Sequence, residues 1–284
     1  MIIDKKIEID SISLSTTPIF LIKNGKKNFN GTGFFYSHLL SHDKRILYLA
    51  TALHVLIGTP PFKNKSPIAE EIEFYFPFSS DKKIGKVKRV KYPLLGKNKK
   101  PLYITHPLNL EVDAALIPIN TEDYSECFSG KNVSLNSISN NWPNPELKVR
   151  ISTNVVAIGY PFGFHDVINS LPIWKTGNMA SEPNIDFLGK PLFLVDISAF
   201  KGMSGSPVLA ITHEMSELED NRVIAGGTKK FLGLLTFMRT IKNGFDEIDL
   251  QLGYVWKSRI IYEIAQSINL DKYQNSILYK SKNR

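Results

Sequence analysis

The sequence contains a single cysteine, Cys127, among its 284 residues, so no disulfide can form within the chain. Disulfides are characteristic of oxidising compartments, and a chain that cannot form one fits a reducing interior. The first ten residues alternate charged and apolar side chains and lack the continuous apolar core of a secretory signal. These features predict a cytoplasmic protein. No motif surrounds Cys127, so we expect a small, partly buried apolar residue there and not a nucleophile.

Long apolar runs and paired cysteines are also missing. No stretch of about 18 apolar residues occurs, so no membrane-spanning helix and no membrane partner are expected. Without paired cysteines at metal-ligand spacing, we expect no metal and no other cofactor. The composition, 43% hydrophobic and 22% charged, is that of an ordinary globular protein, and the length suits two compact units.

Acidic residues are outnumbered, which gives a formal net charge of +8. The excess is concentrated in residues 82–100 and 272–284. Such a segment could attract nucleic acid or an acidic protein. However, the residues interleaved with the lysines suit a strand pair better than a base-stacking surface; they are Ile84, Val87, Val90 and Tyr92. We therefore predict a solvated hairpin and expect no nucleic-acid partner.

The segment Lys-Gly-Met-Ser-Gly-Ser-Pro-Val at residues 201–208 carries the first candidate for chemistry. Glycines on both sides of Ser204 allow a tight loop whose N–H groups turn inward. A hydroxyl in such a loop is a candidate nucleophile, although Gly, Ser and Pro also form ordinary surface turns.

A serine nucleophile needs a base, and the base needs a third group to orient it. Residues 47–56 form an apolar strand that runs into His54, and Asp113 opens the apolar run of residues 113–119. A carboxylate at the start of a buried strand needs a partner, because an unpaired buried charge is costly. A core histidine is the alternative for His54. The other five histidines lack its context, and the weaker acidic candidates are Asp81, Glu111 and Asp123.

Taken in chain order, TALH (51–54), DAAL (113–116) and GMSGSP (202–207) resemble the His, Asp and Ser segments of the chymotrypsin/trypsin superfamily. The resemblance is to its bacterial trypsin-like branch, which includes the high-temperature-requirement proteases. Three other segments resemble that family's strand before the histidine, its G-x-P-x-G segment and its cleft-lining strand: GTGFF (31–35), IGYPFG (158–163) and GLLTF (233–237). The resemblance extends over residues 17–256.

This resemblance implies an all-β fold of two six-stranded antiparallel barrels, a chymotrypsin-like double barrel, with a C-terminal helix. The expected divisions are an N-terminal extension (1–16), a first barrel (17–120), a linker (121–147), a second barrel (148–256), and a helix with a basic tail (257–284). In the second barrel we expect strands at 149–151, 154–159, 172–179, 192–198, 207–211, 231–238 and 251–256. Residues 213–222 read as an acidic surface loop, and Ser258 as the cap of the helix.

By the same resemblance, Ser204 attacks a peptide carbonyl, His54 transfers the proton, and Asp113 orients the imidazole. The backbone N–H groups of Gly202 and Ser204 then receive the oxyanion. Met203 stands before the nucleophile, where the digestive enzymes have an aspartate that pairs with a newly cut N-terminus. Activation by N-terminal cleavage is therefore not expected, and the loop must be ordered by its own sequence or by an activating partner.

The resemblance places Ser198 near the base of a specificity pocket, with Phe237 and Met238 at its entrance and Thr236 hydrogen-bonded toward Asp113. No acidic residue lies at the pocket base, so a preference for Lys or Arg is not supported, and Met238 points to a small or medium apolar residue.

The sequence thus predicts an intracellular trypsin-like serine endopeptidase that cleaves proteins or peptides through an acyl-enzyme. The alternatives are a catalytically silent or partner-activated binding module with the same fold, an esterase, and a nucleic-acid-binding protein.

Overall fold

A computed structural model describes residues 9–41, 44–61, 66–80, 83–96, 98–120, 136–139, 142, 144, 146–243, 246–269 and 278–280. Side chains are described for these residues except in 77–80, 83–86, 237–243, 246–248 and 278–280. Cys127 and most of the predicted linker lie outside this part of the chain.

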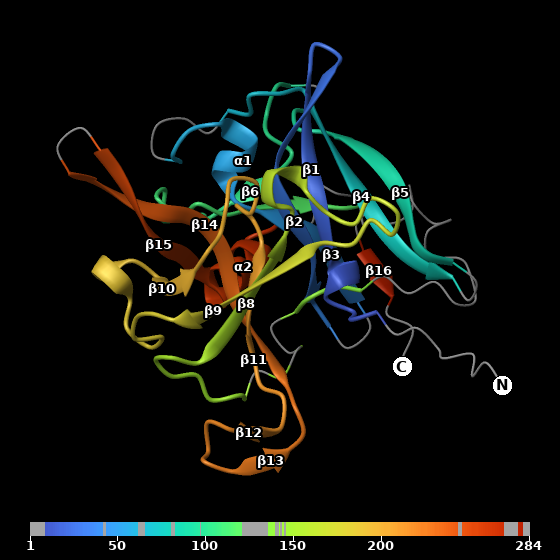
Figure 1. Ribbon diagram of the computed structural model, residues 1–284. Coiled ribbons are helices and arrows are strands. Elements are labelled where there is room, and N and C mark those ends of the chain that lie inside the picture. The colour runs from blue at the N-terminus through green and yellow to red at the C-terminus, as the bar shows by residue number, and fades with distance from the viewer. Residues whose placement is uncertain are drawn as a thin grey trace.

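The N-terminal half forms one antiparallel sheet (Figure 1). Its hydrogen-bonded order is β5-β4-β1-β2-β3-β7-β6, and β16 near the C-terminus adds to β3. The strands are β1 (Thr16–Lys23), β2 (Lys26–Leu39), β3 (Lys44–Thr51), β4 (Glu71–Ser80), β5 (Lys83–Pro93), β6 (Ile104–Thr105), β7 (Ala115–Pro118) and β16 (Leu278–Lys280).

The C-terminal half forms a closed antiparallel barrel with the order β10-β15-β14-β11-β8-β9. A small hairpin of β12 and β13 lies at the bottom of Figure 1, on the far side of the barrel from α1. The strands are β8 (Asn154–Gly159), β9 (Ile173–Met179), β10 (Leu192–Ile197), β11 (Pro207–Ile211), β12 (Met215–Glu217), β13 (Val223–Ala225), β14 (Lys229–Asn243) and β15 (Asp246–Lys257).

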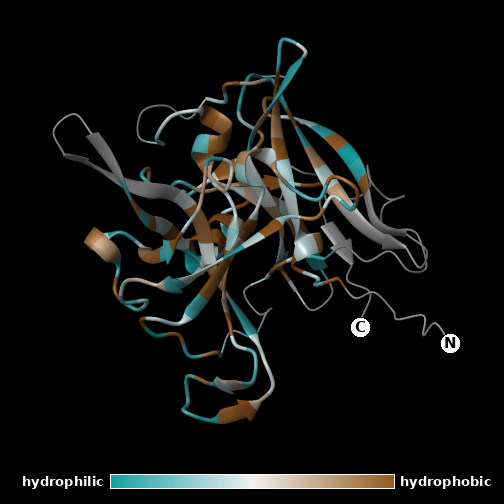
Figure 2. Ribbon diagram, in the orientation of Figure 1, coloured by the Kyte–Doolittle hydropathy of each residue, from teal (hydrophilic) through white to brown (hydrophobic). Residues whose placement is uncertain are grey.

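Two α-helices accompany these strands in the described residues, α1 (Leu53–Ile57) and α2 (Ser258–Gln266). His54 is the one polar residue of helix α1 (Figure 2). The other residues of this helix are apolar and buried. Short 3-10 turns occur at η1 (Ser13–Ser15), η3 (Pro161–Gly163) and η4 (Phe187–Gly189). Within the part of the chain that the structure describes, no helix has the length and apolarity needed to cross a membrane.

Two apolar clusters fill the molecule. The smaller one lies inside the barrel and includes Val155, Ala157 and Met203. The larger one consists of side chains from the first sheet, packed together with side chains from the outer face of the barrel and from one face of α2. On β8, Val156 and Ile158 belong to the larger cluster while Val155 and Ala157 belong to the smaller, because alternate side chains of a strand point to opposite faces. The two halves therefore share one core.

The predicted all-β class, with a six-stranded barrel, a second antiparallel unit and a C-terminal helix, is confirmed. The first unit is larger than the six strands predicted, because seven strands of its own are joined by β16. The basic segment forms the predicted hairpin, β4–β5.

Three local predictions were wrong. Residues 149–151 are not a strand, because the chain turns there and Lys148 N–H pairs with Glu217 instead. Residues 213–222 are not simply a loop, since they contain β12 and begin the turn to β13. Ser258 begins α2 as its first residue, and Lys257 occupies the capping position without a side-chain hydrogen bond.

Candidate active site

The pairing of β3 with β7 brings His54 and Asp113 together. The two strands are antiparallel, with Thr51 opposite Ala115. His54 follows Thr51 by three residues at the end of β3, and Asp113 precedes Ala115 by two at the start of β7. The end of one antiparallel strand lies beside the start of its neighbour, so the two residues meet at the same edge of the sheet.

The carboxylate of Asp113 accepts two hydrogen bonds from His54. Its Oδ1 accepts the backbone N–H of His54 at 2.8 Å, and its Oδ2 lies 2.6 Å from Nδ1 of the ring. An ionised carboxylate can only accept, so Nδ1 carries the proton and Nε2 keeps its lone pair. Asp113 is 1% exposed, whereas the His54 side chain is 20% exposed. The imidazole therefore has the tautomer and the solvent access of a general base.

Ser204 lies on the loop between β10 and β11, which is docked against the first sheet. Gly205 has φ +91°, and a Cβ at that position would lie 2.0 Å from the carbonyl oxygen of Thr32. Only glycine permits both this backbone conformation and this close approach. The carbonyl of Ser204 accepts the N–H of Thr32 at 2.9 Å. The serine loop is thus fixed to β2, the strand that also lies against α1 through Gly31 and Val55.

The hydroxyl of Ser204 donates to the carbonyl oxygen of Thr236, on β14, at 2.8 Å. Among the hydrogen bonds between described residues, none joins Ser204 to His54. Rotation about χ1 moves a serine hydroxyl between staggered positions without any change in the backbone. In the resting state the Ser204 hydroxyl is therefore bonded to Thr236 and not to His54.

Two peptide groups of the serine loop, Lys201–Gly202 and Met203–Ser204, have carbonyls that are already hydrogen-bonded. The carbonyl of Lys201 accepts the N–H of Phe162 at 2.7 Å, and the carbonyl of Met203 accepts the N–H of Ser206 at 2.9 Å. In a trans peptide the C=O and the following N–H point in opposite directions. The N–H groups of Gly202 and Ser204 thus point away from these partners, and neither has an acceptor among the described residues. Such unpaired donors can receive an oxyanion.

Thr32 joins the two halves at this loop, a role that the sequence analysis missed. Its hydroxyl donates to the carbonyl of Gly202 at 2.8 Å and accepts the N–H of Tyr160 at 3.1 Å. Its own carbonyl accepts the hydroxyl of Thr51 at 2.7 Å. Both peptide groups of Gly202 are consequently held, one by Thr32 and one by Phe162. The Gly-Thr-Gly motif marked this segment in the sequence, but not the function of its threonine.

Met203 orders the loop from inside the barrel. Its side chain is fully buried in the smaller apolar cluster, where an ion pair would have no place. The backbone of Tyr160 lies against Gly202 of the same loop. Burial raises the pKa of Tyr160 far above its usual range, so this phenol stays protonated and donates to the carbonyl of Thr16. The loop is thus held by apolar packing and neutral hydrogen bonds.

The predicted pocket residues are only partly in the described region. Ser198 is half-buried at the end of β10. Thr236 does not bond Asp113 as expected, because its hydroxyl donates to the carbonyl of Tyr254 at 3.4 Å; the two oxygens of Asp113 accept from His54. The side chains of Phe237 and Met238 lie outside the described residues.

Metal ligands do not gather in the described part of the chain, where no group of three or more His, Cys, Asp or Glu side chains could hold an ion. His38 stands four residues before His42 in the sequence. However, His38 is buried in β2 against the ring of Tyr262, and His42 lies outside the described residues.

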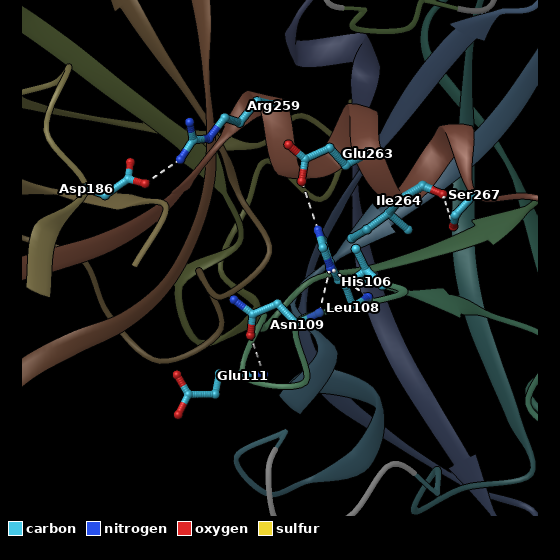
Figure 3. Close-up of polar contacts among 9 residues, drawn as sticks. All are labelled: His106, Leu108, Asn109, Glu111, Asp186, Arg259, Glu263, Ile264 and Ser267. Atoms are coloured by element: carbon cyan, nitrogen blue, oxygen red, sulfur yellow. Dashed lines mark hydrogen bonds and ion pairs between the residues drawn. The ribbon is translucent and has the colours of Figure 1, made fainter. Parts of the chain in front are cut away.

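A polar network ties helix α2 to the loop that leads to Asp113 (Figure 3). Nε2 of His106 lies 2.8 Å from Oε2 of Glu263 on α2, and Nδ1 accepts the N–H groups of Leu108 and Asn109 at 3.3 and 2.9 Å. Because Nδ1 accepts, Nε2 must carry the proton. In the same way Arg259 reaches from α2 to Asp186 beside the barrel, and the neighbouring Lys257 holds the pKa of Asp186 below its usual range.

No family model matches the chain, and no curated protein matches it in sequence. Among solved structures, it is similar to the inactive form of the Rv3671c protease, with 15% identity, a TM-score of 0.44 and 91% of each chain covered. A mutant of this protein from M. tuberculosis H37Rv is also similar, with 15% identity and a TM-score of 0.42 over 91% of this chain and 88% of the other. A tobacco etch virus protease mutant has 11% identity and a TM-score of 0.42, over 89% of this chain and 78% of the other. At this level of similarity, the assignment of function depends on the geometry of the site.

Proposed function

We propose that the chain is a serine endopeptidase that uses Ser204, His54 and Asp113. The observation that carries the proposal is the pair of hydrogen bonds that His54 donates to Asp113 from its backbone N–H and from Nδ1, which leave Nε2 as the acceptor nitrogen of the ring. The pair of unpaired N–H groups at Gly202 and Ser204 supports it independently. Burying a carboxylate costs desolvation free energy, and a purely structural role for Asp113 would not require that cost.

The reaction begins when Ser204 Oγ rotates from Thr236 to His54 and bonds to the carbonyl carbon of a peptide. His54 Nε2 takes the hydroxyl proton, and the oxyanion is received by the N–H groups of Gly202 and Ser204. The C–N bond then breaks, the amine leaves with the proton from His54, and water hydrolyses the acyl-enzyme by the reverse sequence. Asp113 keeps its charge throughout and stabilises the imidazolium. We propose a protein or peptide substrate and, from the lone cysteine, a cytoplasmic location.

The hydrogen bond from the Ser204 hydroxyl to Thr236 favours one alternative, a partner-activated or silent module with the same fold. In an active protease, the hydroxyl would return to His54 without help. In a silent module, it would stay with Thr236.

Labelling with a fluorophosphonate probe tests the proposal, because the probe reacts with activated serines and mimics the tetrahedral intermediate. We expect wild-type protein to be labelled, Ser204→Ala not at all, and His54→Ala at least 1000-fold more slowly. Labelling that survives Ser204→Ala would contradict the assignment. Folded but unlabelled wild-type protein would favour the silent or partner-activated module.

A further inference from the structure

Phe162 combines two features that rarely occur together in one residue. Its backbone lies in the left-handed region with φ +51°, and its side chain is 69% exposed. A residue with a Cβ pays conformational free energy in this region, whereas glycine does not. An exposed phenylalanine also gains little from burial. Neither local geometry nor packing explains why the residue is phenylalanine, and such outliers concentrate at functional sites.

Phe162 lies directly beside the serine loop. Its N–H is the donor that fixes the Lys201 carbonyl and thereby turns the N–H of Gly202 toward the oxyanion position. The ring of Phe162 is 6.0 Å from the ring of Phe200, which is 46% exposed at the start of the same loop. Phe29, from β2, continues this apolar surface beneath Gly202, because a Cβ on Gly202 would lie 2.5 Å from its ring.

Three more exposed apolar residues follow Phe162 along the chain. Phe164 is 71% exposed, and further apolar residues, Val167 and Ile168, are at least as exposed. Clustered exposed apolar side chains mark a binding surface, whereas isolated ones are unremarkable. Phe162 is joined to the proposed oxyanion site by its hydrogen bond to Lys201, so the occupant of its surface is the chain that crosses Ser204.

We propose that Phe162 and Phe200 bind an apolar side chain of the substrate, in the segment that follows the scissile bond. The inference rests on the proposed endopeptidase function. We place the segment before the bond elsewhere, along the edge of β14 beyond Leu235, whose backbone is the last of this edge to bond the serine loop, at Gly205 and Ser206. There the carbonyl of Thr236 faces Ser204. An extended peptide over Ser204 therefore has β14 on one side and the Phe162 surface on the other. The substrate class is a polypeptide with an apolar residue on the leaving side.

Two variants of Phe162 separate the ring from the backbone. Phe162→Ala removes the ring and keeps a Cβ in the left-handed region, while Phe162→Gly removes the ring and the strain together; both keep the N–H that holds Lys201. Leu188 is the matched control, because it is also exposed, has φ +56°, and precedes a left-handed glycine in η4.

The experiment starts from an internally quenched peptide library randomised on both sides of the cleaved bond. The best sequence is then made twice, once with its full leaving segment and once with a p-nitroanilide in its place. We expect the library to select apolar residues after the bond. We expect both Phe162 variants to lose about 10- to 100-fold in kcat/KM on the full peptide, the range for losing one buried apolar side chain. The Phe162 variants should lose much less on the p-nitroanilide and in fluorophosphonate labelling than on the full peptide, and Leu188→Gly should match wild type in all three measurements.

The outcomes separate this inference from the proposed function. If wild-type protein is labelled but the variants cleave both substrates at wild-type rates, the Phe162 surface does not bind the leaving segment. Equal losses on both substrates would also overturn the inference, since they would place Phe162 in the oxyanion site alone. If wild-type protein is not labelled at all, the endopeptidase function itself is wrong. Phe162→Gly should be no less stable than wild type, so misfolding does not account for a loss.

Discussion

At the scale of single residues, the serine loop depends on hydrogen bonds from the other half of the molecule. Thr32 is fully buried, and its hydroxyl serves both the carbonyl of Gly202 and the N–H of Tyr160. A buried polar group that loses its partner costs more free energy than the bond itself contributed, because the desolvation is no longer offset. The hydroxyl of Thr32 should therefore matter both for stability and for the oxyanion site.

We expect Thr32→Val, which keeps the shape of the side chain and removes the hydroxyl, to lower the free energy of unfolding by about 1–3 kcal/mol. The rate of fluorophosphonate labelling should fall by about 10-fold or more, as Gly202 loses one of its two holds. Thr32→Ser keeps the hydroxyl and should stay close to wild type in labelling. Denaturant unfolding and labelling rates check both statements, and a Thr32→Val protein that is labelled at the wild-type rate would show that Phe162 alone orients Gly202.

The sequence could reveal the three reactive segments because each is a local pattern, a strand or loop with one polar residue at a fixed place. It could not reveal Thr32 or Phe162 as supports of the site. The Thr32–Gly202 hydrogen bond spans 170 residues, and no local pattern specifies it. The predicted bond from Thr236 to Asp113 failed for a related reason, because the hydroxyl of Thr236 bonds the carbonyl of Tyr254 on β15, and no local pattern specifies that partner.

At the scale of elements, the sequence predicted the ends of a strand correctly where the whole strand is buried. It placed the ends wrongly where a strand continues past its apolar segment. Strand β11 was predicted at the residues where it lies, because all of its side chains are buried. Strands β14 and β15 run well beyond their predicted bounds, since pairing with each other maintains them outside the apolar segment. The hairpin of β12 and β13 was missed because Glu217 pairs with Arg150, a contact between distant segments.

The connection between β6 and β7 gives a prediction at this scale. Residues 107–112 lead to Asp113, and their turn is built on Nδ1 of His106, while Nε2 faces Glu263 on α2 (Figure 3). In His106→Asn, the amide oxygen can take the place of Nδ1 as an acceptor; in His106→Gln, the longer amide can reach Glu263 but not serve the turn. We expect faster amide hydrogen exchange at Leu108 and Asn109 in His106→Gln than in His106→Asn.

Fluorophosphonate labelling should be about 10-fold slower in His106→Gln than in His106→Asn. A loosened turn no longer fixes the position of Asp113, and His54 is then less well oriented. If the two variants exchange alike, or if His106→Asn is the slower in labelling, then the contact with α2 is what matters and not the turn. Glu263→Ala distinguishes these cases, since it removes only that contact.

At the scale of the whole molecule, the two halves are joined by a shared core. The larger apolar cluster contains residues of β3, of the outer barrel face and of α2, while β16 returns from the C-terminal side to pair with β3. Separate unfolding of the two halves would expose this common surface. The chain should therefore unfold as one cooperative unit, and a buried group in one half should influence the stability of both.

His38 is such a group. It lies in β2 at 6% exposure, its ring is 5.3 Å from that of Tyr262 on α2, and burial lowers its pKa. The unfolded chain binds the proton at the ordinary histidine pKa of about 6.5, whereas the folded chain resists it. The contribution of neutral His38 to stability is therefore fully present above about pH 6.5 and is lost as the pH falls below it. In this range, His38 adds at most one proton to the difference between the unfolded and folded states.

Replacing His38 by Phe should remove this contribution, so the free energy of unfolding should fall less steeply between pH 6.5 and 5 than in wild type. Denaturant unfolding at several pH values measures the slope, which is independent of any constant cost of fitting the larger ring. His213→Phe is the control, because it makes the same substitution at an exposed histidine. Equal slopes for His38→Phe and wild type would mean that the folded chain accommodates a charged His38, and that acid weakens the shared core through other groups.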